Sequence, residues 1–246
     1  MKQTRNLLLT GAIALVASVF SACGGGSGAS NVPTDGLLGE LPAVAAKYLP
    51  EINDLQQQRW HSSSEENRES IAKKEDALKA EWAEAIKKVP SLEGVEIPLE
   101  AAEGMPLRPD ANLKITLVTV KDDDVSIKAE TTATVTKDTP CTDWNDFCMV
   151  AYDTDGNALT VNGGQCCYGI SNDNIDWKAN TYKEGSQGKT MFVTSSRKGT
   201  IWKNPVGWAK LAKVVMMNRN SEAFKKAKEQ VEAAEAAAEA AAKKKE

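Results

Sequence analysis

Four cysteines in the second half of the chain are the densest group of reactive side chains: Cys141, Cys148, Cys166 and Cys167. Zinc sites use thiolates at spacings of about two to four residues, and here six residues separate the first pair while the second pair is adjacent. A Cys-x-x-Cys motif for redox exchange is absent from the sequence. These spacings argue against a metal site. A chain that carries an export signal, as residues 1–22 indicate, meets an oxidising compartment, so we predict disulfides.

The adjacent pair limits which bonds can form. Neighbouring residues of a strand point to opposite faces, so Cys166 and Cys167 should reach different partners, and a bond between them would be strained. If the chain turns back near Gly156, the arrangement that fits best is nested, with Cys148 bonded to Cys166 and Cys141 bonded to Cys167. The other pairings stay open, since sequence alone does not fix connectivity.

Tryptophans beside acids and amides offer a second kind of chemistry. Indole faces next to carboxylates suit sugar rings, which need both stacking and hydrogen-bond partners. The candidates for ligand binding are Trp144, Trp177, Trp202 and Trp208, with Asp143, Asp146 and Asp176 as neighbouring acids. Because Trp is often mostly buried, core or loop packing is the alternative for all four.

The remaining polar motifs indicate turns and surface positions. Asp153 to Asn157 contains part of a calcium loop but lacks its further ligands, so it predicts a hairpin turn. The run Asp122 to Asp124 predicts a solvated turn, and His61 predicts a surface histidine. Ser195-Ser196-Arg197 lacks the glycine frame of a hydrolase nucleophile. We assign no catalytic residue and favour a protein that is not an enzyme.

The N-terminus has the pattern of an export signal. Lys2 and Arg5 precede an apolar run from Leu7 to Phe20, whose 14 residues would span about 21 Å as a helix. A bilayer core of about 30 Å needs a longer segment. Residues 1–22 therefore predict a cleavable signal peptide and not a permanent span.

The end of this signal, Phe20-Ser21-Ala22-Cys23, resembles the lipobox of bacterial lipoprotein precursors. The resemblance implies cleavage before Cys23, a diacylglyceryl group on its thiol and a fatty acid such as palmitate on its amine. This covalent lipid is the sole prosthetic group that we expect. An ordinary secretory signal cut after Ala22 is the alternative. The glycine-rich stretch that follows predicts a flexible tether, which we extend over residues 23–35.

Charge and the tether restrict location and partners. With 30 basic and 34 acidic side chains the net charge is −4, which argues against a protein that binds nucleic acid. An acidic body is also repelled by an anionic membrane surface, so the lipid must anchor the protein to the membrane. The absence of an acidic cluster after Cys23 favours the periplasmic face of a bacterial envelope over the cell surface. We predict a lipid-anchored envelope protein with a binding or structural role; a glycan-binding or glycan-processing accessory protein is the alternative.

The elements that position these residues follow from hydrophobic periodicity. Residues 36–90 predict a helical hairpin, in which Pro50 should kink or split the first helix. Ser63 and Glu66 are in capping-box register at the start of the second helix. Its apolar side includes Ile71, Leu78 and Trp82.

Residues 91–220 predict an antiparallel β-sandwich, so the fold class is α+β. Alternation from Val125 to Val135 indicates a half-buried strand, and a change of phase after Leu117 indicates a bulge. The aromatic-apolar strand that begins at Phe147 and enters an Asp-x-Asp-Gly turn resembles immunoglobulin-like modules of bacterial envelope lipoproteins. That resemblance implies an immunoglobulin-like sandwich.

Residues 221–246 predict a helix rich in Ala, Glu and Lys. Phe224, Val231 and Ala238 lie seven apart, as in a coiled-coil seam. The helix is expected either to pack loosely on the first two helices or to bind a protein partner through this seam.

Overall fold

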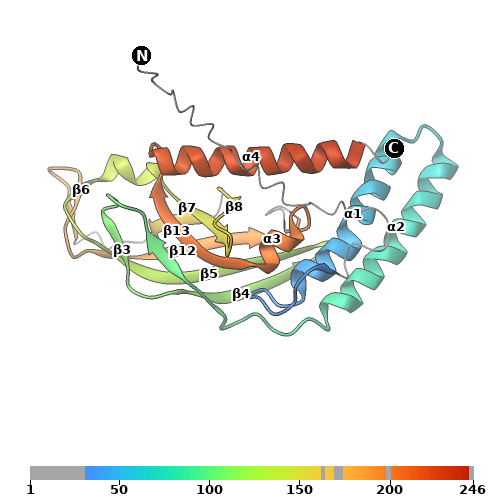
Figure 1. Ribbon diagram of the computed structural model, residues 1–246, viewed down its shortest axis with the longest axis horizontal. Helices are drawn as coiled ribbons and strands as arrows, with labels where there is room; N and C mark the ends of the chain where they lie inside the picture. The colour runs from blue at the N-terminus through green and yellow to red at the C-terminus, as the bar shows by residue number, and fades with distance from the viewer. Residues whose placement is uncertain (1–30, 162–163, 169–173, 198–200, 244–246) are drawn as a thin grey trace, which may run out of the picture.

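The computed structural model describes residues 31–161, 164–168, 174–197 and 201–243. It combines helices with mainly antiparallel strands, which confirms the predicted α+β class. The long axis runs from a pair of helices at one end, through two packed sheets, to a small sheet that contains β6 (Thr139–Pro140) at the other end (Figure 1).

Two helices, α1 (Leu41–His61) and α2 (Glu65–Ile86), lie side by side and form what we call the helix pair (Figure 1). Apolar residues recur along each at intervals of three and four, so each helix has one face that is driven out of water. The two faces meet in the core, where the ring of Tyr48 contacts the indole of Trp82 edge-on, with 6.3 Å between centroids.

Two details of the helix pair differ from the sequence prediction. Ser64, and not Ser63, caps α2, and its side chain accepts a hydrogen bond from the backbone N–H of Asn67 at 3.4 Å. Helix α1 also continues through Pro50, so the predicted split does not occur. Residues on both sides of Pro50 are buried in the core, so tertiary packing holds the two halves in one helix.

Sheet A has the strand order β1-β4-β5-β12-β9, with β3 beside the last residues of β5. Along β5 the side chains alternate as predicted, with Val125 and Ile127 among those that face the core. The predicted bulge is present but lies before Leu117 and not after it, since the register of β4 against β5 shifts between Ile115 and Leu117. The strands are β1 (Glu96–Ile97), β3 (Leu107–Pro109), β4 (Leu113–Lys121), β5 (Asp124–Val135), β9 (Gly164–Tyr168) and β12 (Gln187–Ser195).

Sheet B has the order β2-β13-β7-β8, in which β13 pairs antiparallel with β7 and parallel with β2. Its strands are β2 (Leu99–Ala101), β7 (Phe147–Asp153), β8 (Ala158–Thr160) and β13 (Leu211–Asn218). The 3₁₀ helix η2 (Cys141–Asp146) leads into β7. Beyond it, β6 pairs with β11 (Thr181–Tyr182), which pairs with β10 (Ile175–Asp176).

The turn between β7 and β8 confirms the predicted hairpin. Oδ1 of Asp153 accepts hydrogen bonds from the backbone N–H groups of Asp155 at 2.9 Å and Asn157 at 2.8 Å. Gly156 adopts a φ of +81°, which suits glycine. The carboxylate that a calcium ion would need is therefore occupied by donors of the turn itself.

Helix α4 (Glu222–Lys243) covers the face of sheet B that points away from sheet A (Figure 1). The predicted seam makes this contact: Ala227 is buried, and Phe224 and Val231 pack on the same cluster as Val215 of β13. The expectation that this helix packs on the first two helices is therefore wrong. The outer face of sheet B presents Val150, Val215 and Met217 to this seam.

The first described residues already pack on the body. Val32 is buried with Ala46 of α1 and Ala209 of α3 (Pro205–Ala209). Gly36 comes so close to α3 that a Cβ atom there would lie 1.9 Å from the carbonyl oxygen of Ala209. The last part of the predicted tether, residues 31–35, thus belongs to the folded body, while Cys23 and residues 24–30 lie outside the described residues.

The contact between α4 and sheet B can be tested by placing a charge in it. Ala227→Lys should lower the free energy of unfolding by about 2 kcal/mol or more, because an ammonium group would be buried without a partner. Urea unfolding and limited proteolysis of α4 measure the effect. Ala233→Lys, the same change at an exposed position of the same helix, is the control; equal effects of the two changes would contradict this packing.

Candidate functional site

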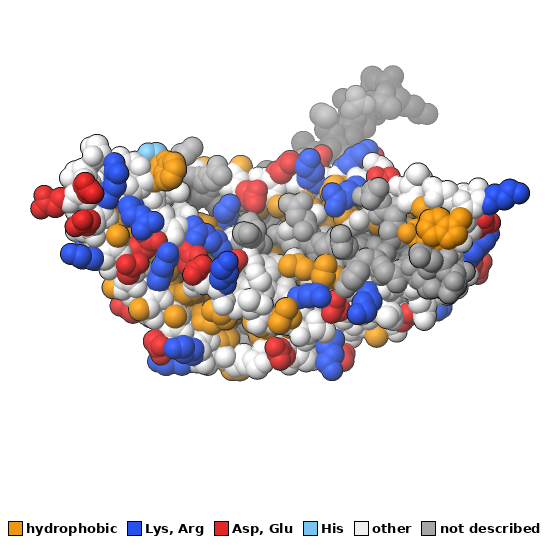
Figure 2. Space-filling model, turned by 180° about the vertical axis from the view of Figure 1, so that it is seen from behind, with side chains coloured by type: hydrophobic (Ala, Val, Ile, Leu, Met, Phe, Trp, Pro, Cys, Tyr) orange, Lys and Arg blue, Asp and Glu red, His pale blue; other side chains and the backbone are white. Residues whose placement is uncertain are grey.

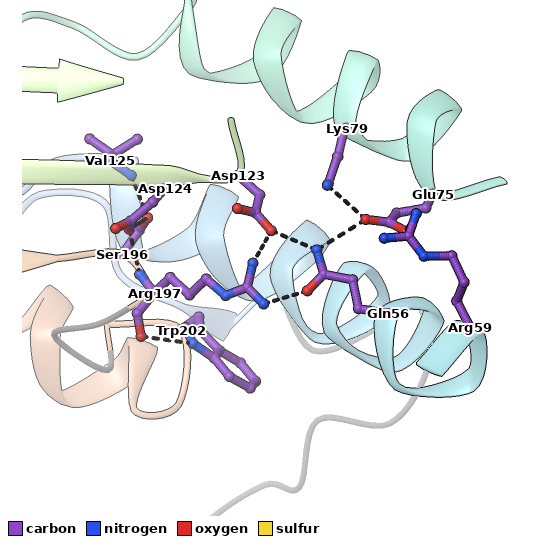
Figure 3. Close-up of polar contacts among 10 residues, drawn as sticks. All are labelled: Gln56, Arg59, Glu75, Lys79, Asp123, Asp124, Val125, Ser196, Arg197 and Trp202. Atoms are coloured by element: carbon purple, nitrogen blue, oxygen red, sulfur yellow. Dashed lines mark hydrogen bonds and ion pairs between the residues drawn. The ribbon is translucent and has the colours of Figure 1, made fainter. Parts of the chain in front are cut away.

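Charged and polar side chains from four segments meet where the helix pair joins sheet A (Figure 3). We call this group the junction cluster. Its members are Gln56 and Arg59 of α1, Glu75 and Lys79 of α2, Asp123 and Asp124 at the β4–β5 turn, and Ser196 and Arg197 after β12.

The carboxylate of Glu75 is the most buried charge of the cluster, with 0% of the residue exposed. Nζ of Lys79 lies 2.7 Å from its Oε1, and Nη1 of Arg59 lies 2.9 Å from its Oε2. Burial would raise the pKa of Glu75, but hydrogen bonds from Lys79 and Gln56 and the two nearby cations outweigh burial and hold the pKa below its ordinary value of 4.5. Glu75 therefore stays ionised inside the protein.

The side chain of Gln56 connects the helix pair to the strands. Its Nε2 donates to Oε1 of Glu75 at 3.0 Å and to Oδ2 of Asp123 at 3.1 Å. Its Oε1 accepts a hydrogen bond from Arg197, and the same guanidinium group is ion-paired with Asp123. One amide thus bridges two carboxylates, which would repel each other without the cations beside them.

Ser196 is buried against the start of β5. Its hydroxyl donates to Oδ1 of Asp124 at 2.8 Å and accepts from the backbone N–H of Val125 at 2.7 Å. The backbone N–H of Arg197 also donates to Asp124 at 2.8 Å, and Nε1 of Trp202 donates to the carbonyl of Arg197 at 3.3 Å. These bonds fix the segment after β12, and since 0% of Ser196 is exposed, no substrate reaches its hydroxyl.

Sequence reasoning missed most of this cluster. The run Asp122 to Asp124 was expected to be a solvated turn, but Asp123 is buried against Arg197 and Asp124 accepts from Ser196. The turn itself is real, with Asp122 at a φ of +52°. The burial of Glu75 could have been predicted from its position in the sequence. It lies four residues after Ile71 and seven before Trp82, and so on the apolar stripe of α2.

The four tryptophans proposed for ligand binding do not form one surface. Trp208 is 0% exposed in the core, which removes it as a ligand contact, and Trp202 packs partly buried against the same core. Trp177 is 66% exposed beside β10. The side chain of Trp144 lies outside the described residues. Large side chains of a small sandwich are needed for its core, which accounts for the first two positions.

The acidic residues beside these tryptophans make hydrogen bonds within their own loops or to a neighbouring segment. Oδ1 of Asp176 accepts from the backbone N–H groups of Ala179 at 3.0 Å and Lys178 at 3.1 Å. The bond from Ala179 is the main reason that the pKa of Asp176 lies below its usual range. Asp143 accepts from the hydroxyl of Thr142 at 3.3 Å, and the backbone carbonyl of Asp146 accepts from the N–H of Arg219 at 2.7 Å.

The cysteines are placed in part. Cys141 is half-buried in η2, and Cys148 is buried on β7, where its Sγ lies 3.5 Å from the carbonyl oxygen of Met217. Burial raises the pKa of the Cys148 thiol to about 11, so this group is not a thiolate near neutral pH. β9, which carries Cys166 and Cys167, lies beside β7, but both side chains are outside the described residues. The nested pairing stays a prediction.

An open groove of about 870 Å³ lies between the last turns of α1 and the first turns of α2. The indole of Trp60 stands in it with 84% of the residue exposed, next to the exposed His61 at the end of α1. Trp60 falls just past the apolar stripe of its helix, which is the signal that sequence reasoning passed over. The residues that line the groove are Gln56, Gln57, Arg59, Trp60, Glu65, Arg68, Glu69 and Ala72.

In comparisons with known proteins, no protein-family model, no curated protein and no solved structure matches the chain. Within the described residues, no helix has the length and apolar character needed to cross a bilayer. A search of the same residues for three or more His, Cys, Asp or Glu side chains placed to share a metal ion finds none.

Glu75→Gln should destabilise the protein by about 1–3 kcal/mol at pH 7, because Lys79 and Arg59 lose the charge that they neutralise. Folding lowers the pKa of Glu75, so its contribution is complete above 4.5 and is lost as the pH falls through the lower folded value. The difference between wild type and variant in urea unfolding should therefore shrink below pH 4.5.

The exposed pair of Glu84 with Lys87 on the same helix supplies the control. Glu84→Gln should change stability little at any pH, since solvent screens a surface pair. A pH-independent loss in Glu75→Gln would show that shape, and not charge, matters at this position.

The cysteine prediction has its own test. In protein exported to an oxidising compartment, alkylation under denaturing conditions should label none of Cys141, Cys148, Cys166 and Cys167. Peptide mapping without reductant should then recover Cys148 joined to Cys166 and Cys141 joined to Cys167. Four labelled thiols would overturn the prediction of disulfides.

Proposed function

We propose that the chain is a lipid-anchored protein of the bacterial cell envelope, with lipid attached at Cys23 and a folded body that binds a partner or has a structural role. The observation that carries the proposal is the lipobox-like sequence Phe20-Ser21-Ala22-Cys23 behind a short apolar run. We further propose that the body stands on the periplasmic face of its membrane, because no acidic cluster follows Cys23.

The distance from anchor to body supports this arrangement. The described fold begins at residue 31, and Val32 is already buried against α1 and α3. Eight residue steps from Cys23 reach about 28 Å at most when extended, and about 16 Å on average for a glycine-rich chain. A lipid on Cys23 would therefore hold the body close to the bilayer surface.

A binding or structural role is supported by how the polar side chains of the junction cluster are used. Glu75 faces Arg59 of the neighbouring helix, and Asp123 faces Gln56 of α1 as well as Arg197, so these two charges hold the helix pair together and on sheet A. Asp124 faces Ser196 and so holds the segment after β12. The two largest exposed aromatic side chains described, Trp60 and Trp177, are in contrast open to contact with another molecule.

The immunoglobulin-like character of the body remains part of the proposal. Two mainly antiparallel sheets around one core support it, whereas the parallel pair of β13 with β2 departs from a wholly antiparallel sandwich. A protein partner for α4 also remains a proposal. Phe224, Ala227 and Val231 of its seam already pack on sheet B, so such a partner would contact other residues of the helix.

Glycan binding is the second candidate function. It is favoured by Trp177, which is 66% exposed, and by the groove at Trp60, which offers an indole among amide, carboxylate and guanidinium groups. This candidate is compatible with lipid anchoring, because an anchored body can carry a sugar-binding surface.

Labelling with an alkyne analogue of palmitate in a bacterial host tests the anchor. The wild-type chain should incorporate the label and sediment with membranes, whereas Cys23→Ala should lose the label and appear in the soluble fraction after export. Cys141→Ala is the matched control and should keep both properties. Wild-type protein without label, or labelled Cys23→Ala, would refute attachment at this position.

A further inference from the structure

We propose that the groove at the free end of the helix pair is a binding site for the pyranose rings of a neutral saccharide, with Trp60 as its stacking platform. The inference deepens the binding role proposed above and is independent of the lipid on Cys23. In Figure 2 an orange patch lies beside the pale blue histidine at the helix-pair end, with blue and red side chains around it.

The exposure of Trp60 is the first observation. An indole that is 84% exposed at the end of a helix leaves a large apolar face in water. Covering that face with a ligand recovers roughly 25 cal/mol for each Å² removed from water. A sugar ring has an apolar face of C–H groups with hydroxyls around its rim, so it can cover an indole and still be hydrogen-bonded at its edge.

The polar lining supplies partners for such hydroxyls. Gln57, Glu65 and Glu69 line the groove, and none of their side chains makes a hydrogen bond or ion pair with another described residue. A carboxamide both donates and accepts, and a carboxylate accepts from hydroxyl groups. Arg68 contributes a guanidinium whose Nε donates to the carbonyl of Ser62 at 2.7 Å, which holds the side chain in place.

The balance of charge favours a neutral ligand. The lining carries two cations, Arg59 and Arg68, and two anions, Glu65 and Glu69, and the side chain of Arg59 is 45% exposed although it is paired with Glu75. Charges of both signs in one groove would disfavour a strongly charged molecule of either sign, while a neutral polyol can bond to all of them.

The shape also suits a ring. Glu65, Arg68, Glu69 and Ala72 recur at intervals of three and four on one face of α2, opposite Trp60 and Gln57 of α1. Ala72 is the smallest side chain of the lining and leaves depth between the helices. The volume of about 870 Å³ falls within the ordinary range of ligand sites, about 300–1,000 Å³.

Calorimetric titration of the purified full chain, recovered from whichever cell fraction holds it, tests the site. The probes are cellotetraose, chitotetraose, maltotetraose and mannotetraose. At least one should bind saturably, and Trp60→Ala should weaken it about tenfold or more. Trp60→Phe should retain part of the affinity, and Gln57→Ala should weaken binding with the indole still present.

Leu117→Ala is the matched control, because Leu117 is a large apolar side chain, 49% exposed, on β4 and outside the lining of the groove. It should leave the affinity unchanged, and thermal unfolding should show the Trp60 and Leu117 variants folded. Trp177→Ala tests whether the other exposed indole, beside β10, binds the saccharide instead. The proposal is overturned if no probe binds, if Trp177→Ala abolishes binding and Trp60→Ala does not, or if a lysine-rich peptide binds through Trp60 and no saccharide does. None of these outcomes bears on palmitate labelling of Cys23.

Discussion

A carboxylate that leaves water must be surrounded by donors, and Glu75 imposes this condition where the helix pair meets the sheets. Lys79 and Arg59 neutralise its charge, while Gln56 joins it to Asp123 and, through Arg197, to the segment after β12. Apolar contacts in the same region hold the elements together but allow several orientations. Directional bonds select one of them, as buried polar groups do in some other proteins.

The second constraint is that the described residues cover both faces of sheet B but one face of sheet A. Along β7 nearly every residue is buried, because one face meets sheet A and the other meets α4. Along β5 buried and partly exposed residues alternate, because none of the described helices lies over the outer face of sheet A. The layers therefore run sheet A, sheet B and α4, with the helix pair closing one end of the core (Figure 1).

Features that depend on local periodicity could be predicted from the sequence. The alternation of β5, the bulge before Leu117 and the hairpin at Gly156 follow from neighbouring residues alone. The junction cluster could not be predicted in the same way, since Gln56 and Arg197 are 141 positions apart. The packing of α4 on sheet B was not predicted, for a related reason. A periodic pattern identifies the apolar face of a helix but not the surface on which that face will pack.

The place where the chain enters the body also determines how a pull on it would be borne. A chain tethered at Cys23 would transmit tension to Val32 and Gly36, which sit against α1 and α3 and not at the edge of a sheet. The force would then act on side chains packed between two helices. The hydrogen bonds between neighbouring strands would not be broken one after another. The hydrogen-bonded sheets would be mechanically shielded from movement of the anchor.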